Sequence, residues 1–192
     1  MQALPSAPAG AKRRQILVGT ALASAAAASL FMGMIGLWLR MRDSARAAGL
    51  PWLPEDTVVP DVAANVMLLA LIPIGVFAQW AVYAAKRDDR PHTGVALALV
   101  GAVGLMFINA QAYIWSQMNL SADGGTYQAM FYALTGVLVA AAIVGVVFSA
   151  VTAFRYLGGR TTDREVVAAH ALYWYVLSAA YAVLWFVVYV TK

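Results

Sequence analysis

The stretch MFYALTGVLVAAAIVGVV, residues 130–147, opens with aromatic and polar side chains and continues as an apolar run. Tyr132 and Thr135 are its polar groups, and nothing after Thr135 can bind a metal, transfer a proton or attack a substrate. The stretch lies within residues 124–154, which contain no Asp, Glu, Lys or Arg. A helix needs about 20 apolar residues to cross the hydrocarbon core of a membrane. We therefore interpret this segment as a transmembrane helix.

The rest of the chain has the same character. Of its 192 residues, 62% are hydrophobic and 11% are charged, whereas a soluble domain carries about 25% charged residues. Four further stretches lack all four charged residue types: 15–39, 62–85, 93–122 and 166–191. They show no alternation of the kind found in membrane barrel strands. The sequence predicts an all-α, polytopic membrane protein that forms a five-transmembrane-helix bundle.

We expect two regions. Residues 1–14 are predicted to be a disordered cytoplasmic tail, and residues 15–192 a single membrane domain. The first apolar run is too long for a cleaved signal peptide, so we interpret it as a retained helix. In the loop that follows, Trp52 is expected at the level of the lipid headgroups. The five helices are predicted at about 15–39, 62–85, 93–117, 127–154 and 166–190.

Basic residues predict the orientation, because Lys and Arg concentrate on the cytoplasmic side. One side of the predicted bundle carries nine basic residues and the other carries four. We therefore expect a multi-pass protein of the cell (inner) membrane, with a cytoplasmic N-terminus and an external C-terminus. The nine are Lys12, Arg13, Arg14, Lys86, Arg87, Arg90, Arg155, Arg160 and Arg164, and the four are Arg40, Arg42, Arg46 and Lys192.

The sequence offers little chemistry at membrane depth. The chain has no cysteine, and all nine acidic residues lie in predicted loops or at helix ends. Of Asp, Glu, His, Lys and Arg, only His170 lies inside a predicted span, and we interpret it as a hydrogen-bonded interfacial residue near the cytoplasmic side. We therefore predict no catalytic, cofactor-binding or metal-binding residue in this chain. Whether the chain is part of an enzyme is left open by these residues.

The richest polar group lies in the third predicted helix. Asn109 and Tyr113 are four residues apart, as are Tyr113 and Gln117, and Gln111 lies between them. Residues at this spacing share a helix face. Two interpretations stay open: hydrogen bonding between helices, or a site for a lipid headgroup or a partner subunit.

Several motifs resemble those of subunit III of the haem–copper terminal oxidases, in a short form with five helices. VYAAKRDD at 82–89 resembles the end of a family helix, and NAQAYIW at 109–115 resembles the family segment Gln-Ala-Tyr-Glu-Tyr. FYALTGVLVAAAIVGVVFSAVTAFR at 131–155 resembles a helix that opens Phe-Tyr-x-x-Thr-Gly, and LYWYV at 172–176 adds a fourth match. The matching residues are Gln111, Tyr113, Phe131, Tyr132, Thr135, Gly136, Gly145, Arg155, Tyr173 and Trp174.

The chain also departs from the family pattern at its polar positions. After Thr-Gly the family has Phe-His-x-x-His, and the family Glu of the third segment is replaced here by Ile114. A family His and a nearby Asp in the last helix are replaced by Tyr175 and Ser178. Loss of both partners of a buried polar pair can be nearly neutral, so the helical framework is expected to fold without them. The residues at the Phe-His-x-x-His positions are Val137, Leu138 and Ala141.

The resemblance implies a cofactor-free accessory subunit that stabilises the catalytic subunit of a respiratory oxidase and holds lipids during aerobic electron transport. Haem and copper are expected in the partner catalytic subunits, including subunit I, and no nucleic acid is expected as a partner. It also implies that helices one and two stand partly apart from the other three, with lipid between. The candidate packing or lipid-contact residues are Asn109, Gln111, Tyr113, Thr135, Gly136, His170 and Trp174.

Two other functions remain open at this stage. A subunit III-like partner of a nitric-oxide reductase would show the same features. A small stand-alone membrane transporter is the third alternative, although the lack of buried charges argues against ion coupling.

Overall fold

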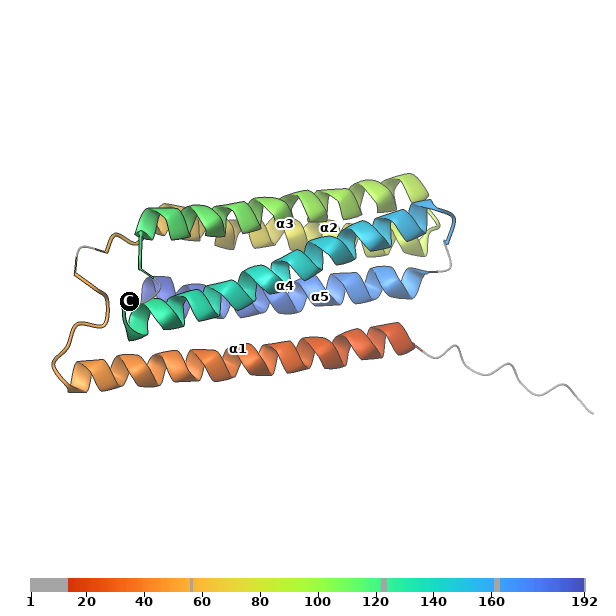
Figure 1. Ribbon diagram of the computed structural model, residues 1–192. Coiled ribbons are helices and arrows are strands. Elements are labelled where there is room, and N and C mark those ends of the chain that lie inside the picture. The colour runs from red at the N-terminus through yellow and green to blue at the C-terminus, as the bar shows by residue number, and fades with distance from the viewer. Residues whose placement is uncertain (1–13, 56, 122–123, 161–162, 192) are drawn as a thin grey trace, which may run out of the picture.

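The computed structural model describes residues 14–55, 57–121, 124–160 and 163–191. Within these ranges the chain is helical and contains no strand (Figure 1). The predicted tail, except for Arg14, lies outside the described residues. The elements are α1 Gln15–Ala47, α2 Asp61–Lys86, α3 Arg90–Met118, α4 Thr126–Leu157 and α5 Arg164–Trp185, which continues as the π-helical turn η1 Phe186–Val190.

The five helices are each long and apolar enough to span a membrane. This confirms the prediction of an all-α chain with five such segments. The longest difference in boundaries is at the end of α1, which continues to Ala47 although the predicted segment stopped at residue 39. The charged residues that follow Leu39 mark where an apolar stretch ends, but Arg, Met and Ala are good helix formers and keep the helix going.

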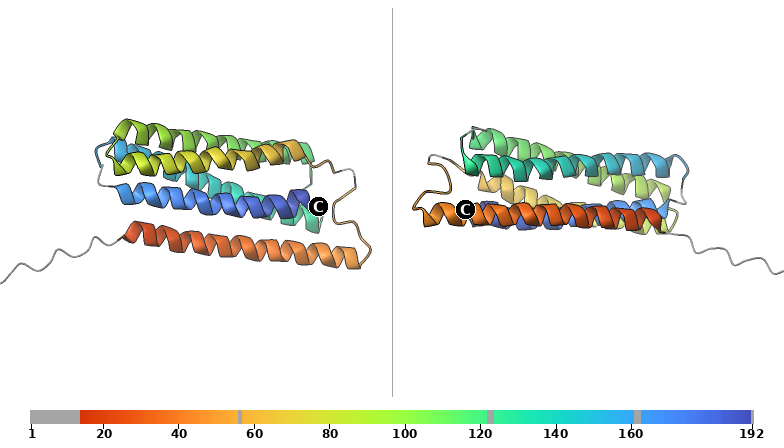
Figure 2. Two further views of the ribbon diagram at one scale, coloured as in Figure 1. Left: turned by 180° about the vertical axis from the view of Figure 1, so that it is seen from behind. Right: turned by 60° about the horizontal axis from the view of Figure 1, so that its bottom comes forward.

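The helices run side by side, with α5 in a central position (Figure 1; Figure 2). α1 lies against one side of α5 and makes a smaller contact with α4. α2 lies against another side of α5 and pairs closely with α3, which in turn pairs with α4. The expectation that helices one and two form a group apart is therefore wrong. α2 is an integral part of the four-helix group, and only α1 lies to one side.

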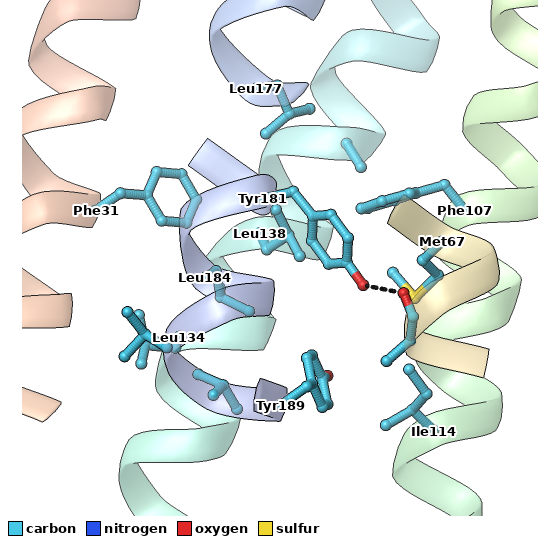
Figure 3. Packing of buried hydrophobic residues seen from close by; sticks show 14 of the residues in the cluster. Phe31, Met67, Phe107, Ile114, Leu134, Leu138, Leu177, Tyr181, Leu184 and Tyr189 are labelled. Atoms are coloured by element: carbon cyan, nitrogen blue, oxygen red, sulfur yellow. Dashed lines mark hydrogen bonds between the residues drawn. The ribbon is translucent and has the colours of Figure 1, made fainter. Parts of the chain in front are cut away.

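The core is made of apolar and aromatic side chains from all five helices. Tyr181 of α5 is fully buried, and its ring contacts Phe107 of α3 edge-on at 4.9 Å between centroids. Its hydroxyl donates to the backbone carbonyl of Ala64 in α2 at 3.0 Å (Figure 3). One side chain thus connects three helices, and its polar end is satisfied inside the core.

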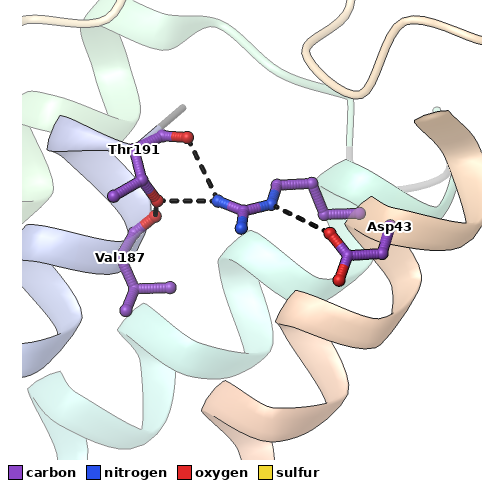
Figure 4. A network of polar contacts seen from close by, with 4 residues as sticks. Asp43, Val187 and Thr191 are labelled. Carbon is purple, nitrogen blue, oxygen red and sulfur yellow. Dashed lines mark hydrogen bonds and ion pairs between the residues drawn. The ribbon is translucent and has the colours of Figure 1, made fainter.

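α1 is the least buried of the five helices, and polar contacts hold both its ends to α5. Near its start, the Leu17 amide donates to a Glu165 carboxylate oxygen at 2.9 Å. This satisfies an amide that has no partner within the first turn of a helix. Near the other end, the Arg42 guanidinium donates to the Thr191 carbonyl at 3.1 Å and to its hydroxyl oxygen at 2.7 Å (Figure 4).

The turn between α2 and α3 is short, and Asp89 caps the start of α3. Its carboxylate accepts from the His92 amide at 3.2 Å and lies 2.7 Å from the His92 ring nitrogen Nδ1. The His92 side-chain contact, followed by the amide contact, lowers the pKa of Asp89 below its ordinary value of 3.8. An acidic N-cap also interacts favourably with the helix dipole.

Candidate functional site

Three buried polar side chains meet between α4 and α5. Ser149 Oγ lies 2.7 Å from His170 Nε2, and the Trp174 indole N–H is 3.1 Å from both atoms. Ser149 also donates to the Gly145 carbonyl, four residues earlier in α4, at 2.9 Å. His170 is fully buried and Trp174 is 1% exposed. The structure thus brings together two predicted site residues, His170 and Trp174, with a serine that the sequence did not single out.

The hydrogen bonds of this cluster favour one arrangement of protons. If the Ser149 hydroxyl donates to the Gly145 carbonyl, its oxygen can accept from His170 Nε2–H and from Trp174. His170 Nδ1, which has no partner, is then an unpaired acceptor. An unpaired acceptor is better tolerated than a buried, unpaired N–H. We therefore assign the Nε2–H tautomer from the network. Among the described residues, no group forms a hydrogen bond with the remaining ring nitrogen, Nδ1.

Two glycines make room for Trp174. A Cβ at Gly145 would lie 2.8 Å from the Trp174 ring, and a Cβ at Gly104 would lie 2.7 Å from it. Both distances are shorter than real Cβ contacts. The indole ring therefore fills a space that exists only because α3 and α4 each have no side chain there. Gly104 and Gly145 position Trp174, and Trp174 in turn donates to Ser149.

The opening polar residues of the quoted stretch bind neighbouring groups at the other end of α4. The fully buried Thr135 donates to the Phe131 carbonyl at 2.7 Å and accepts from the Trp115 indole of α3 at 2.9 Å. The Tyr132 hydroxyl donates to the Leu120 carbonyl at 2.8 Å. Gly136, by contrast, has open space beside it, since a Cβ there would meet nothing within 4 Å. Thr135 and Gly136 are neighbours in the sequence but face different surroundings.

The polar residues of α3 divide between two faces. Asn109, Tyr113 and Gln117 are exposed, and Tyr113 is 52% exposed. Gln111 is fully buried, and neither of its amide atoms makes a hydrogen bond. It lies close enough to Tyr189 for their polar groups to interact, but not at an ordinary hydrogen-bond distance. The structure therefore places the exposed three residues together and separates Gln111 from them.

An aromatic cluster at the far end of α1 was not predicted. The centroid of the Trp52 ring lies 5.1 Å from that of Trp38 and 5.5 Å from that of Tyr127, and all three side chains are buried. Trp52 is 8% exposed and fastens the loop before α2 against α1 and α4. The sequence signal was the run Pro51-Trp52-Leu53-Pro54, an apolar patch inside a loop rich in charge. The structure encloses most of the Trp52 ring in protein, so little of the ring is left to contact lipid headgroups.

Two of the positions that depart from the family pattern lie in the apolar core, and a third is exposed. Ile114 of α3 and Leu138 of α4 are both fully buried (Figure 3). Tyr175 is 39% exposed and donates to Gln79 at 2.9 Å. Among the described residues, no three His, Cys, Asp or Glu side chains gather where they could hold a metal ion. Some polar groups near the core bind one another or backbone carbonyls, and others, such as the Gln111 amide, have no hydrogen-bond partner.

These features define a class: the described residues form an all-helical protein with five segments long and apolar enough to span a membrane. Residues 50–192 match the family model of cytochrome c oxidase subunit III, so the chain belongs to the cytochrome c oxidase subunit III family. The matched range includes α2 to α5, and α1 ends before it begins.

Individual relatives agree with this assignment. A probable cytochrome c oxidase subunit 3 of Rickettsia conorii (strain ATCC VR-613 / Malish 7) is 27% identical over 140 residues, 71% of this chain and 48% of that protein. The corresponding protein of Rickettsia felis (strain ATCC VR-1525 / URRWXCal2) is 33% identical over 94 residues, 49% and 34%. Cytochrome c oxidase subunit 3 of Sus scrofa is 30% identical over 105 residues, 55% and 40%. The matches thus span about half of these relatives or less.

Proposed function

We propose that this chain is a cofactor-free accessory subunit of a haem–copper terminal oxidase in the cell (inner) membrane. The observation that carries the proposal is the family match over α2 to α5. The buried contacts of Thr135 and Trp174, two residues of the family-like motifs, lie within the same helices. In this proposal the bundle stabilises a partner catalytic subunit that holds the haem and copper.

The proposed location and orientation rest on composition. The five apolar helices would cross the membrane, because each provides at least the length of the hydrocarbon core. Of the 13 Lys and Arg residues, nine lie in the segment before α1 or in and beside the turns between α2 and α3 and between α4 and α5, which favours a cytoplasmic N-terminus and an external C-terminus. α1 begins at the same end of the bundle as these two turns (Figure 1).

The core supports a scaffold role over proton transfer by this chain. Ile114 and Leu138 are both buried and apolar, so no unpaired charge remains where the family motifs have Glu and His. A pair lost on both sides leaves no orphaned group and need not cost stability. Contact with membrane lipids on the exposed apolar faces is also part of the proposal, since large residues such as Leu69, Ile72 and Phe154 point outward.

Purification of the tagged chain from its native membranes in mild detergent tests this function. We expect a haem–copper catalytic subunit to co-purify in equal amount, and the preparation to reduce oxygen. A partner that reduces nitric oxide and not oxygen would place the chain in the alternative complex. Recovery of the chain with no catalytic subunit, after cross-linking in the membrane, would argue against both.

A further inference from the structure

The outward side of α3 carries a regular seam, which we define as Val95, Ala98, Ala102, Leu105, Asn109, Ala112 and Ser116. All seven residues are exposed. Their spacing alternates between three and four residues along the whole series, which is the repeat of helices that pair in a left-handed supercoil. Small residues at four positions, three alanines and Ser116, would let a second helix approach closely.

Asn109 is the polar residue in the middle of this seam. Its side chain makes no hydrogen bond with any described residue. α3 has 29 residues, so its length exceeds a hydrocarbon core of roughly 30 Å by about 13 Å. With that excess shared between both ends, Asn109, nine residues before Met118, lies about 7 Å inside the hydrocarbon edge. This depth rests on the proposed membrane location. An unpaired carboxamide is unfavourable in lipid and is typical of a helix interface.

The surface beside the seam can receive side chains from a second helix. A hollow of about 420 Å³ runs along the junction of α3 and α4. Ala98, Ala102 and Leu105 of the seam form part of its wall, and Ala150 and Ala153 of α4 form part of the opposite wall. The hollow is almost entirely apolar where it borders the seam, and Asn109 lies one turn beyond Leu105.

We propose that the seam binds the same seam of a second copy of this chain, with the two α3 helices parallel across a two-fold axis along the membrane normal. In that arrangement each seam residue faces its own counterpart. The two Asn109 carboxamides lie at the same depth, and because a carboxamide has both a donor and an acceptor, each satisfies the other. Lipid chains can neither donate nor accept a hydrogen bond, so the seam favours contact with a protein. Ala102 and Ala112 also face the same residues of the second copy, so the two helices can approach closely on both sides of the Asn109 pair.

The absence of cysteine in the natural chain allows a direct test. Single cysteines placed in the full-length protein, in its native membranes, would be oxidised and scored for disulfide-linked dimers. We expect Ala102→Cys, Asn109→Cys and Ala112→Cys to give dimers. Leu69→Cys on α2 is the matched control, since Leu69 is 60% exposed and lies eight residues inside its helix at the same end of the bundle. It should give little or none.

The contribution of the Asn109 carboxamides to dimerisation is measured separately. Asn109→Ala should weaken dimerisation in lipid about threefold to thirtyfold, the range of measured hydrogen bonds between membrane helices. Asn109→Gln, which keeps the carboxamide, should restore part of the loss. Equal cross-linking at Leu69→Cys and Asn109→Cys would overturn the proposal, as would linkage of Asn109→Cys only to a different protein. Co-purification of the haem–copper subunit is scored in the same membranes, so failure of the dimer is distinct from failure of the proposed function.

Discussion

Gly145 has a hydrogen atom in place of a side chain, and this lets α4 and α5 pack closely. Because a Cβ at this position would lie 2.8 Å from the Trp174 ring, we predict that Gly145→Ala forces the indole to move. The expected loss is about 1–3 kcal/mol of stability, typical of overpacking a core. Thermal unfolding of the purified protein in detergent measures it.

Gly136 is the matched control for this substitution, since it lies in the same helix and nothing would meet its Cβ within 4 Å. Gly136→Ala should leave the stability unchanged or raise it by roughly 0.5–1 kcal/mol, because alanine favours the helical state. Equal destabilisation by both changes would show that helix propensity, and not the Trp174 contact, governs these positions.

Ser149 is the acceptor on which the buried cluster depends. Ser149→Ala removes the oxygen that lies 2.7 Å from His170 Nε2 and 3.1 Å from the Trp174 nitrogen. We expect a loss of about 1–3 kcal/mol, because buried donors are left without a full partner. Chemical unfolding of the variant measures this loss. Ser29→Ala, an exposed serine bonded to its own helix, should have almost no effect, and a similar effect of the two would contradict the assigned role.

The sequence predicted the buried histidine correctly as a hydrogen-bonded residue, but it could not predict its partner. Ser149 is one small hydroxyl in a long apolar helix, and only the packing of α4 on α5 brings it to His170. Gln111 differs, because its spacing of two residues from Asn109 and from Tyr113 already puts it on another helix face, and the structure adds that this face is buried. The direction in which each residue points depends on the neighbouring helices, and spacing alone fixes only which residues share a face.

At the scale of the helix, we expect the stability of the first turn of α3 to depend on pH. The contacts with His92 lower the pKa of Asp89. A group with a lowered pKa in the folded state stabilises that state fully above its unfolded pKa, near 3.8, and loses this effect as the pH falls through the folded value. We predict that the His92 amide is protected from hydrogen exchange above pH 3.8, and that this protection falls as the pH drops through the folded-state pKa of Asp89.

Hydrogen exchange of the His92 amide at a series of pH values, corrected for intrinsic rates, checks this prediction. Asp89→Asn supplies the control, because asparagine is also a good N-cap but does not titrate in this range. The variant should show no comparable change in protection. The same pH dependence in Asp89→Asn would mean that another group is responsible.

α1 should be the helix most easily detached. The Arg42 guanidinium binds the end of the chain at Thr191 (Figure 4), and Glu165 binds the other end of α1 through Leu17. We predict that Arg42→Ala loosens the C-terminal end of α1 by about 1.5–3 kcal/mol, the usual strength of hydrogen bonds to a charged group. Faster hydrogen exchange in the last turns of α1, with α3 unchanged, is the expected result. Uniform acceleration throughout the bundle would contradict it.

The helices themselves could be predicted from charge-free stretches, but their pairing could not. In a soluble helix the apolar stripe shows which side is buried. Here both the core side and the outward side are apolar, as Ile72 and Ile74 of α2 illustrate: one is 64% exposed and the other fully buried. The grouping of α2 with α3 and the burial of Trp52 therefore required the three-dimensional structure.

For the whole molecule, the boundaries of the family match and of the packing coincide. Residues 50–192 include the four helices that pair closely with one another, and α1 lies at their side. α1 is held by its ends and by contacts such as Phe31 and Trp38, which are 3% and 1% exposed. The family match covers α2 to α5, and α1 lies against α5 outside the matched range.

The optical spectrum of the tagged preparation tests the central claim most directly. In mild detergent, the account predicts haem absorbance bands that co-purify with the chain. When the chain is then separated from its partners, the bands should remain with the catalytic subunit and be absent from the isolated polypeptide. Haem that stays on the isolated chain, or a mild preparation with no haem bands, would contradict the account.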